Sequence, residues 1–189
     1  MLESIVQHDR ELFLFLNNLG NPTWDSFWLV ITNKWSSIPL YAVLLFLAYK
    51  NLGARKTVIL VLTVVVMITV TDQLANFFKY GVQRLRPCHN PDVYPYMRLV
   101  KDYCGGQFGY FSAHAANSMA VAFVFTYILR EKYRFIGPLL VLWAVLVGYS
   151  RIYIGVHYPM DVVTGMFFGL VFGWIFVKLF IFAQQKYQL

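Results

Sequence analysis

Residues 57–80 read TVILVLTVVVMITVTDQLANFFKY, and this stretch decides the class of fold. Its first part is almost purely apolar, and the whole stretch exceeds the length of about 20 residues that crosses a bilayer as a helix. The stretch then changes character, because Asp72, Asn76 and Lys79 are spaced so that they share one helix face. A polar face of this kind is costly against lipid. We therefore expect a membrane helix whose polar end faces other helices or a cavity.

The composition of the whole chain indicates a membrane protein. Hydrophobic residues make up 59% and charged residues 13% of the 189 residues, against about 45–50% and about 25% in soluble domains. This composition disfavours a soluble globule and excludes a disordered chain and a disulfide-stapled mini-domain. We predict one all-α domain over residues 1–189, a polytopic transmembrane bundle of about five to six membrane helices. The predicted spans besides 57–80 are 24–49, interrupted near 34–39, then 112–129, 135–154 and 159–182.

Two segments outside these spans have their own character. Residues 1–22 carry apolar side chains at roughly helical spacing, but their longest apolar run is too short to cross a membrane. They predict an N-terminal amphipathic helix at the interface. Residues 81–111 are polar and far more numerous than a hairpin between two spans needs. They predict a long extracytoplasmic loop.

The distribution of positive charge predicts the orientation. Cations at 50, 55, 56, 130, 132 and 134 mark the loops after the first and third spans as cytoplasmic. The opposite side also carries cations, against the rule, and we expect these to hold something anionic. The net charge of +7 then needs no nucleic acid to explain it. We expect a multi-pass protein of a bacterial inner membrane with its site on the periplasmic face. The cations on that side are Lys79, Arg84, Arg86, Arg98, Lys101 and Arg151.

Three short segments converge on this outer face: 79–87 (KYGVQRLRP), 111–114 (FSAH) and 150–161 (SRIYIGVHYPMD). Two predicted helices begin there, at Ser112 and Pro159, so that their free N–H groups and positive dipole ends point toward the same face. Such helix ends bind anions. Together with the cations of these segments they predict a phosphate pocket.

The histidines of these segments predict chemistry in addition to binding. His157 lies four residues before Asp161, close enough for the carboxylate to accept the Nδ1 proton and leave Nε2 free as a nucleophile. His114 begins another helix and can protonate the leaving oxygen. Phosphoryl transfer needs mainly positioning and dispersal of charge, which cations and helix ends provide without a metal or cofactor. We therefore expect a phosphohistidine intermediate that water then hydrolyses.

The pattern K-x6-R-P, S-x-H and S-R-x5-H-x3-D resembles the three-part signature of the type 2 phosphatidic acid phosphatase superfamily, over about residues 58–180. The resemblance implies metal-independent hydrolysis of a lipid phosphate: undecaprenyl diphosphate, phosphatidylglycerol phosphate, phosphatidic acid or lipid A phosphate. The family usually has glycine where this chain has Ala113. The roles that it implies are phosphate binding for Lys79, Arg86, Ser112, the backbone at Ala113, and Arg151, acid and base for His114, nucleophile for His157, and its partner for Asp161.

The two cysteines, Cys88 and Cys104, lie in the same outer loop. A disulfide would close a loop of about 15 residues and stiffen the segment that carries Arg86. A zinc site with His89 and His114 matches no common ligand spacing. The sequence favours the disulfide.

Several further residues have structural interpretations. We expect Asp72 to pair with a cation or to hydrogen-bond between helices. Gly165, Gly169 and Gly173 predict close helix packing. Tyr149, Tyr153 and Tyr158 are expected in the interfacial aromatic belt.

Two other functions use the same residues. A non-catalytic anion or lipid transporter would need a polar pathway across the membrane, whereas the polar residues gather near one face. A phosphotransferase to a lipid acceptor differs only in what receives the phosphate. The sequence predicts membrane lipids and a lipid phosphate as partners, and it leaves the oligomeric state open.

Overall fold

The structure, a computed structural model, describes residues 2–101 and 103–186. Within these residues the chain is helical, with no strand beyond an isolated bridge, which confirms the predicted all-α class. Three short 3-10 helices interrupt the connections: η1 (Lys34–Ser37), η2 (Pro87–His89) and η3 (Tyr94–Tyr96). The α-helices are α1 (Leu2–Asn18), α2 (Pro22–Thr32), α3 (Ile38–Leu52), α4 (Ala54–Val82), α5 (Ala113–Leu129), α6 (Ile136–Tyr153) and α7 (Pro159–Lys186).

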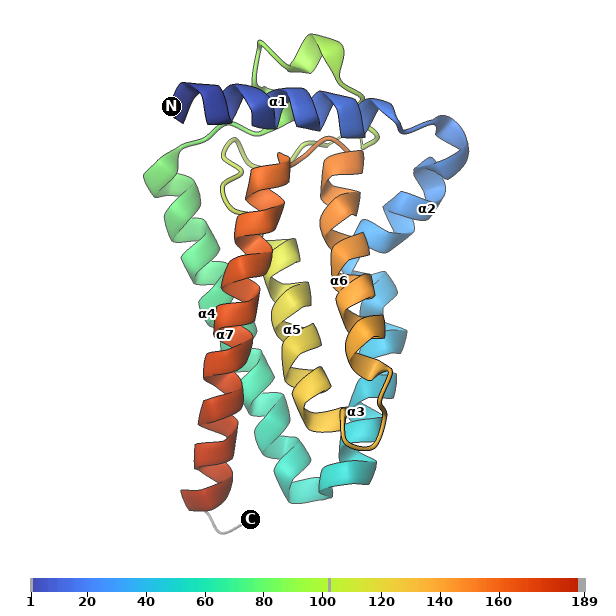
Figure 1. Cartoon of the computed structure of the whole chain (residues 1–189), viewed down its shortest axis with the longest axis vertical. Helices are drawn as coiled ribbons and strands as arrows, with labels where there is room; N and C mark the ends of the chain where they lie inside the picture. Colours follow the sequence, from blue (N-terminus) through green and yellow to red (C-terminus); the bar gives the residue numbers. More distant parts are fainter. Residues whose placement is uncertain (1, 102, 187–189) are drawn as a thin grey trace.

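Helices α3 to α7 run along the long axis of the molecule, and α1 lies across one end of them (Figure 1). The long connection, described over 83–101 and 103–112, lies at the same end as α1. The turns α3–α4 and α5–α6 lie at the opposite end, where the described chain also finishes (Figure 1). The bundle therefore has one end built from short turns and another that carries α1 and the long loop.

Three helices, α4, α6 and α7, are long and apolar enough to cross a membrane. The α2 and η1–α3 segments make a fourth span if they count as one, bent by 65°. This break begins at Asn33, whose side chain accepts a hydrogen bond from the Trp35 N–H at 3.0 Å. The helix α5 has 17 residues and is shorter than the other three. The predicted count of five to six spans therefore stays a prediction.

The small residues of α7 explain how α5 fits in the centre of the bundle. A side chain at Gly165, Gly169 or Gly173 would collide with α5, at Ser112, Ala116 and Phe123 respectively. Because these positions are glycine, the two backbones approach closely over three turns. The close approach of α5 and α7 fixes how the beginnings of both helices lie relative to each other.

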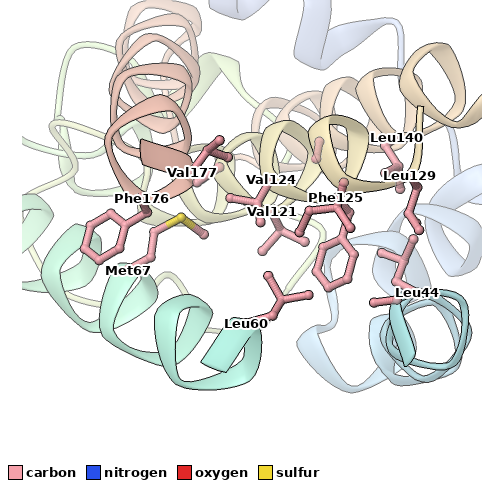
Figure 2. Close-up of a cluster of buried hydrophobic side chains, with 14 of the residues drawn as sticks. Leu44, Leu60, Met67, Val121, Val124, Phe125, Leu129, Leu140, Phe176 and Val177 are labelled. Atoms are coloured by element: carbon pink, nitrogen blue, oxygen red, sulfur yellow. The ribbon is translucent and has the colours of Figure 1, made fainter. Parts of the chain in front are cut away.

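The apolar core fills the part of the bundle away from α1. It joins the second half of α5 to α3, α4, α6 and α7 through fully or nearly fully buried side chains (Figure 2). The end of the bundle under α1 is different, because its buried residues include Arg86, Arg151, His157 and Asp161. The labelled core residues are Leu44, Leu60, Met67, Val121, Val124, Phe125, Leu129, Leu140, Phe176 and Val177.

Candidate active site

The three segments that the sequence analysis singled out, 79–87, 111–114 and 150–161, contribute residues to the wall of one cavity of about 540 Å³. The end of α4, the start of α5, the end of α6 and the turn before α7 all contribute to its wall. Ser112 and Asp161 lie behind this wall and are fully buried. The predicted site residues that line the cavity are Lys79, Arg86, Ala113, His114, Arg151 and His157.

His157 and Asp161 form the centre of the site. The His157 Nδ1 atom lies 3.4 Å from Asp161 Oδ2, and its Nε2 atom lies 3.2 Å from Arg86 Nη1. Because a guanidinium can only donate hydrogen bonds, Nε2 must accept, and the proton of the neutral ring therefore sits on Nδ1. This tautomer leaves the Nε2 lone pair on the side of the cations. The dyad thus has the arrangement that nucleophilic attack by histidine requires.

The surroundings of His157 favour its neutral form. Burial lowers the pKa of His157 well below its ordinary value, and the positive charges of Arg86 and Arg151 lower it further. Gly109 borders the dyad, since a Cβ there would lie 3.5 Å from His157 Nδ1 and 3.3 Å from Asp161 Oδ2. The ring is therefore unprotonated at neutral pH and closely surrounded.

Two buried guanidinium groups face the cavity without a carboxylate partner among the residues that the structure describes. Arg86 donates to the Val156 carbonyl at 3.2 Å, and Arg151 donates to Thr32 Oγ1 at 2.6 Å. The Nε of each has no hydrogen-bond partner in the described part of the chain. A buried cation without a counter-charge is costly. An anion in the cavity would relieve this cost, and the site is therefore suited to an anion.

Lys79 adds a third cation from the last turn of α4. Its Nζ donates to Asn76 Oδ1 at 3.4 Å, and both residues line the cavity. His114, in the first turn of α5, also lines it. The arrangement therefore offers three cations and two histidines to one small volume, which suits binding and transfer of a phosphoryl group.

Ser112 acts as the N-cap of α5, because its Oγ accepts a hydrogen bond from the Ala115 N–H at 3.4 Å. Its own N–H donates to the Asp161 carbonyl at 2.9 Å, which ties the start of α5 to the first turn of α7. Because Ser112 is fully buried and outside the cavity lining, its contact with phosphate stays a prediction. The backbone at Ala113 does border the cavity.

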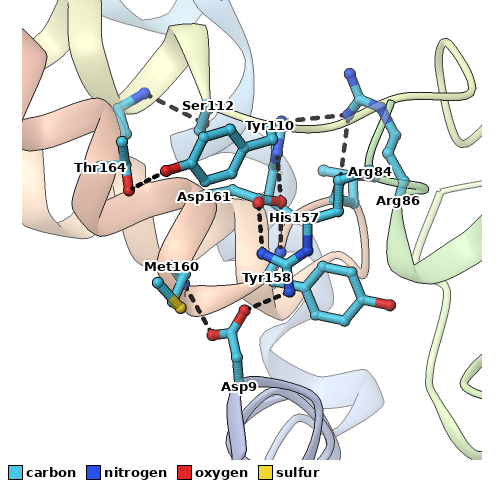
Figure 3. Close-up of polar contacts among 12 residues, drawn as sticks. Asp9, Arg84, Arg86, Tyr110, Ser112, His157, Tyr158, Met160, Asp161 and Thr164 are labelled. Atoms are coloured by element: carbon cyan, nitrogen blue, oxygen red, sulfur yellow. Dashed lines mark hydrogen bonds and ion pairs between the residues drawn. The ribbon is translucent and has the colours of Figure 1, made fainter. Parts of the chain in front are cut away.

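The loop that carries Arg84 and Arg86 is held by its own return segment. The Arg86 N–H donates to the Gln107 carbonyl at 3.0 Å, and the Gly109 N–H donates to the Arg84 carbonyl at 2.9 Å. These bonds flank the antiparallel bridge between residues 85 and 108. Residues 84–86 and 107–109 of the loop therefore pair in antiparallel fashion. This pairing directs the side chains of Arg84 and Arg86 toward His157 and Asp161 (Figure 3).

The structure joins Cys88 and Cys104 by a disulfide, with Cα atoms 6.1 Å apart. His89 lies beside the pair, and the three could form a metal-ligand group by distance. The bond occupies both sulfurs, and His114 does not belong to this group. The structure therefore contains the disulfide that the sequence favours.

Asp72 and Asn117 connect α4 and α5 inside the cavity, with Asn117 Nδ2 donating to Asp72 Oδ1 at 2.8 Å. This is the interhelical hydrogen bond expected for Asp72. Asn117 Oδ1 is buried and has no partner among the described residues. The cavity therefore has a polar wall below the cations, formed by Asp72, Asn76 and Asn117.

The sequence did not predict several residues of the site. Arg84 is visible in the sequence only as one of the outer cations, yet it donates to Asp161 Oδ1 at 2.9 Å. Asp9, on the predicted interfacial helix, accepts from Arg84. Thr32, the last residue of α2, precedes the predicted interruption at 34–39, and no sequence pattern marked it as part of the site.

The predicted aromatic belt is wrong for two of its three tyrosines. Tyr153 and Tyr158 are 3% and 1% exposed. The Tyr158 ring lies under the Arg84 guanidinium at 4.2 Å from its centroid, and its hydroxyl accepts from Asn90 at 3.0 Å. These tyrosines are buried because α1, α2 and the loop pack on this end of the bundle, with Phe13 of α1 against Tyr158 and Trp28 of α2 against Tyr153.

Comparison with known proteins places this geometry in context. Residues 58–185 match the model of the PAP2 superfamily. A "Lipid A 4'-phosphatase" of Porphyromonas gingivalis is 33% identical, covering 98% of this chain and 78% of that protein. A protein of the same description from Bacteroides thetaiotaomicron is 36% identical, covering 93% and 78%. An "Undecaprenyl-diphosphatase" of Sulfolobus acidocaldarius is 32% identical, covering 94% and 81%.

One solved structure supports the same fold. The transmembrane PAP2-type phosphatidylglycerolphosphate phosphatase of Bacillus subtilis superposes with a TM-score of 0.72 at 22% identity. The match covers 95% of this chain and 87% of that one. At this identity the likeness concerns the fold, including the helices before residue 58 that lie outside the family match.

Proposed function

Because the chain belongs to the PAP2 superfamily and is a lipid phosphatase, we propose that it removes the 4'-phosphate of lipid A through a phosphohistidine on His157. The observation that carries this proposal is the cavity in which His157 Nε2 faces two buried arginines without carboxylate partners among the described residues. The same arrangement favours a mechanism without a metal ion, because the cations already supply the positive charge that the transferring phosphoryl group needs.

The proposed reaction begins with attack of His157 Nε2 on phosphorus. The bond between phosphorus and the leaving sugar oxygen breaks, and His114, which enters this step as an imidazolium favoured by the negative charge of the bound phosphate, gives its proton to that oxygen. Asp161 stabilises the positive charge on the imidazole by accepting the hydrogen bond from Nδ1. In the second step His114 removes a proton from water, which attacks phosphorus, breaks the N–P bond and releases inorganic phosphate. Lys79, Arg86 and Arg151 balance the charge on the phosphoryl oxygens in both steps.

One feature of the site favours lipid A over the other candidate lipids. The alignment length does not distinguish them, because the lipid A 4'-phosphatases and the undecaprenyl-diphosphatase all align with more than nine-tenths of the chain. The feature that distinguishes them is the polar wall of Asp72, Asn76 and Asn117. A phosphorylated sugar presents hydroxyl and amide groups beside its phosphate, whereas an isoprenoid diphosphate presents hydrocarbon there. Asn117 Oδ1, which has no hydrogen-bond partner in the part of the chain that the structure describes, suits a hydroxyl or amide donor of a sugar.

An apolar groove between α3 and α4 suits the acyl chains. A cavity of about 190 Å³, lined mainly by aliphatic side chains of these helices and α5, shares three residues with the catalytic cavity. These shared residues are Tyr41, Ile68 and Val121. A lipid can therefore place its phosphate at the cations while its chains remain between helices.

We further propose that the protein lies in a bacterial inner membrane with its site toward the periplasm. The turns that carry the predicted cytoplasmic cations, α3–α4 and α5–α6, lie at the end of the bundle opposite α1 (Figure 1). The site lies at the α1 end. This separation agrees with the orientation that the charges of the short turns favour.

The proposal is tested by phosphate release from purified protein in EDTA with four lipids: lipid A bisphosphate, undecaprenyl diphosphate, phosphatidylglycerol phosphate and phosphatidic acid. We expect fastest release from lipid A, with mass spectrometry locating the loss at the 4' position. His157→Gln should lower the rate by about 10³-fold or more, because the nucleophile is lost. His8→Gln, at an exposed histidine of α1, should leave it unchanged.

Other outcomes of this test would contradict parts of the proposal. Faster release from undecaprenyl diphosphate would reject lipid A and keep the phosphatase mechanism. Activity that needs a divalent metal, or that survives in His157→Gln, would reject the phosphohistidine. Transfer of the phosphate to another lipid in place of release would identify a phosphotransferase.

A further inference from the structure

The interfacial helix α1 sends one carboxylate into the catalytic site. Asp9 is 4% exposed, although the neighbouring residues 7, 8 and 11 on the same helix are exposed. Figure 3 shows Asp9 pointing from α1 toward Arg84 and the first turn of α7. A buried carboxylate on an otherwise amphipathic surface helix needs a specific partner.

Asp9 has two such partners. Its Oδ2 accepts from Arg84 Nη2, and its Oδ1 accepts from the Met160 N–H at 2.9 Å. The other nitrogen of the same guanidinium, Arg84 Nη1, donates to Asp161 Oδ1 at 2.9 Å. One arginine therefore bridges the carboxylate of α1 and the carboxylate that contacts His157 (Figure 3).

The Arg84 guanidinium is held firmly in this position. It stacks on the buried ring of Tyr158 with 4.2 Å between the guanidinium carbon and the ring centroid. Its backbone carbonyl accepts from the Gly109 N–H at 2.9 Å. The bridge between Asp9 and Asp161 is thus part of the packed structure and not a mobile surface ion pair.

The charges explain why the second carboxylate matters. Asp161 must stay anionic toward His157, because its negative charge stabilises the positive imidazole that forms when Nε2 bonds to phosphorus. Paired with Asp161 alone, the charge of Arg84 would offset that carboxylate and weaken its effect on His157. Asp9 supplies a second negative charge to Arg84, so that Asp9, Arg84 and Asp161 together carry one net negative charge.

We propose that Asp9 and Arg84 are positioning residues of the reaction: they fix Asp161 against His157 and preserve its negative charge toward the imidazole. This role rests on the proposed nucleophile, His157. It also gives α1 a part in catalysis, although α1 lies outside the segment that matches the family.

The test compares Asp9→Asn with Glu11→Gln, which removes an exposed carboxylate from the same helix. Both variants are assayed with the lipid that the wild type hydrolyses fastest, and their melting temperatures are measured. We expect Asp9→Asn to lower kcat about 10- to 100-fold, as loss of a supporting contact to a catalytic group commonly does, with KM within about twofold. Glu11→Gln should leave both constants unchanged.

A conservative variant distinguishes the effect of the Asp9 charge on catalysis from the effect of Asp9 on the docking of α1. Asp9→Glu keeps the charge and disturbs the packing, so we expect it to recover most of the kcat that Asp9→Asn loses. Equal losses in Asp9→Glu and Asp9→Asn would overturn the proposal, as would a loss confined to KM or wild-type kcat in Asp9→Asn. The Asp9→Glu comparison also decides the matter if Asp9→Asn folds poorly.

Substitution of Arg84 provides an independent test of the proposal. Arg84→Gln leaves two buried carboxylates facing each other, and adding Asp9→Asn removes one of them. We expect the double variant to have a higher kcat than Arg84→Gln alone, since the two sites are coupled. Additive losses would contradict the bridge. His157→Gln serves as reference: if it keeps activity, the proposed function fails, whereas its inactivity beside normal Asp9→Asn kinetics rejects only this inference.

Discussion

Two regions of the bundle are built on opposite principles. Along α5 and α7, Gly165, Gly169 and Gly173 bring the two helices into close contact. Beside the beginnings of these helices, Arg86 of the long loop and Arg151 of α6 are buried and face a cavity without carboxylate partners in the described chain. The first region stabilises the fold, and the second holds positive charge that an anionic ligand can neutralise. We therefore expect stability and activity to depend on different residues in these two regions.

The largest difference between the effect on activity and the effect on stability should come from Arg151→Met. Removal of a donor that stabilises transition-state charge commonly costs about 10²- to 10³-fold in kcat, and we expect a loss of this size in phosphate release. The melting temperature should not fall, because the variant removes a buried cation that has no carboxylate partner among the described residues. A parallel loss of folding would contradict the comparison and assign Arg151 to stability.

The opposite result is expected where Gly165, Gly169 and Gly173 of α7 contact α5. Gly169→Val places a side chain against Ala116 of α5 and should destabilise the protein by about 1–3 kcal/mol through overpacking. Activity per folded molecule should stay close to that of the wild type. Gly81→Ala is the control, because a Cβ at Gly81 of α4 meets no atom within 4 Å beyond its own helix backbone and chain neighbours, and it should not lower the melting temperature. Equal shifts in both variants would argue against close packing as the cause.

The charge of the site also predicts its pH dependence. His157 must be unprotonated to attack, and burial with Arg86 and Arg151 nearby lowers its pKa below the ordinary value. The acidic limb of kcat/KM that belongs to His157 should therefore lie below pH 6.5. In Arg86→Gln the residual activity should show this limb at higher pH, because a positive charge that opposed protonation is gone. A limb that stays in place, or moves to lower pH, would contradict this electrostatic account.

The smallest effect is expected at an exposed pair beside the site. Arg10 lies 3.7 Å from Asp92, whose side chain is 74% exposed, so Arg10→Gln should change the free energy of unfolding by less than about 0.5 kcal/mol. Its kcat should equal that of the wild type. A large loss of kcat would mean that any charge change on α1 affects the site. The effect of Asp9→Asn would then give no evidence for a positioning role of Asp9.

The sequence predicted the features that depend on neighbouring residues. The helix class, the break near Lys34 and the N-cap at Ser112 follow from apolar runs, polar interruptions and capping chemistry. The His157 and Asp161 pair follows from a spacing of four residues. Each of these is a local pattern, and the structure places all of these residues at the positions expected.

The sequence could not predict contacts between distant segments. Arg84 and Asp9 are separated by 75 positions, and Asp9 and Met160 by 151; no periodicity relates such residues. Tyr153 and Tyr158 show the same limit, because a tyrosine near a predicted helix end suits a membrane interface as well as a buried site. The docking of α1, α2 and the loop at this end of the bundle buries them.

The central claim is that His157 carries the phosphoryl group, and the most direct measurement is to trap it. Purified protein is mixed with lipid A labelled with ³²P at the 4' position, quenched in alkali within the first turnovers and digested for peptide mapping. The account predicts acid-labile, alkali-stable label on the peptide that contains His157, and none in His157→Gln. Rapid phosphate release with no labelled histidine at any quench time, or label on another residue, would contradict it.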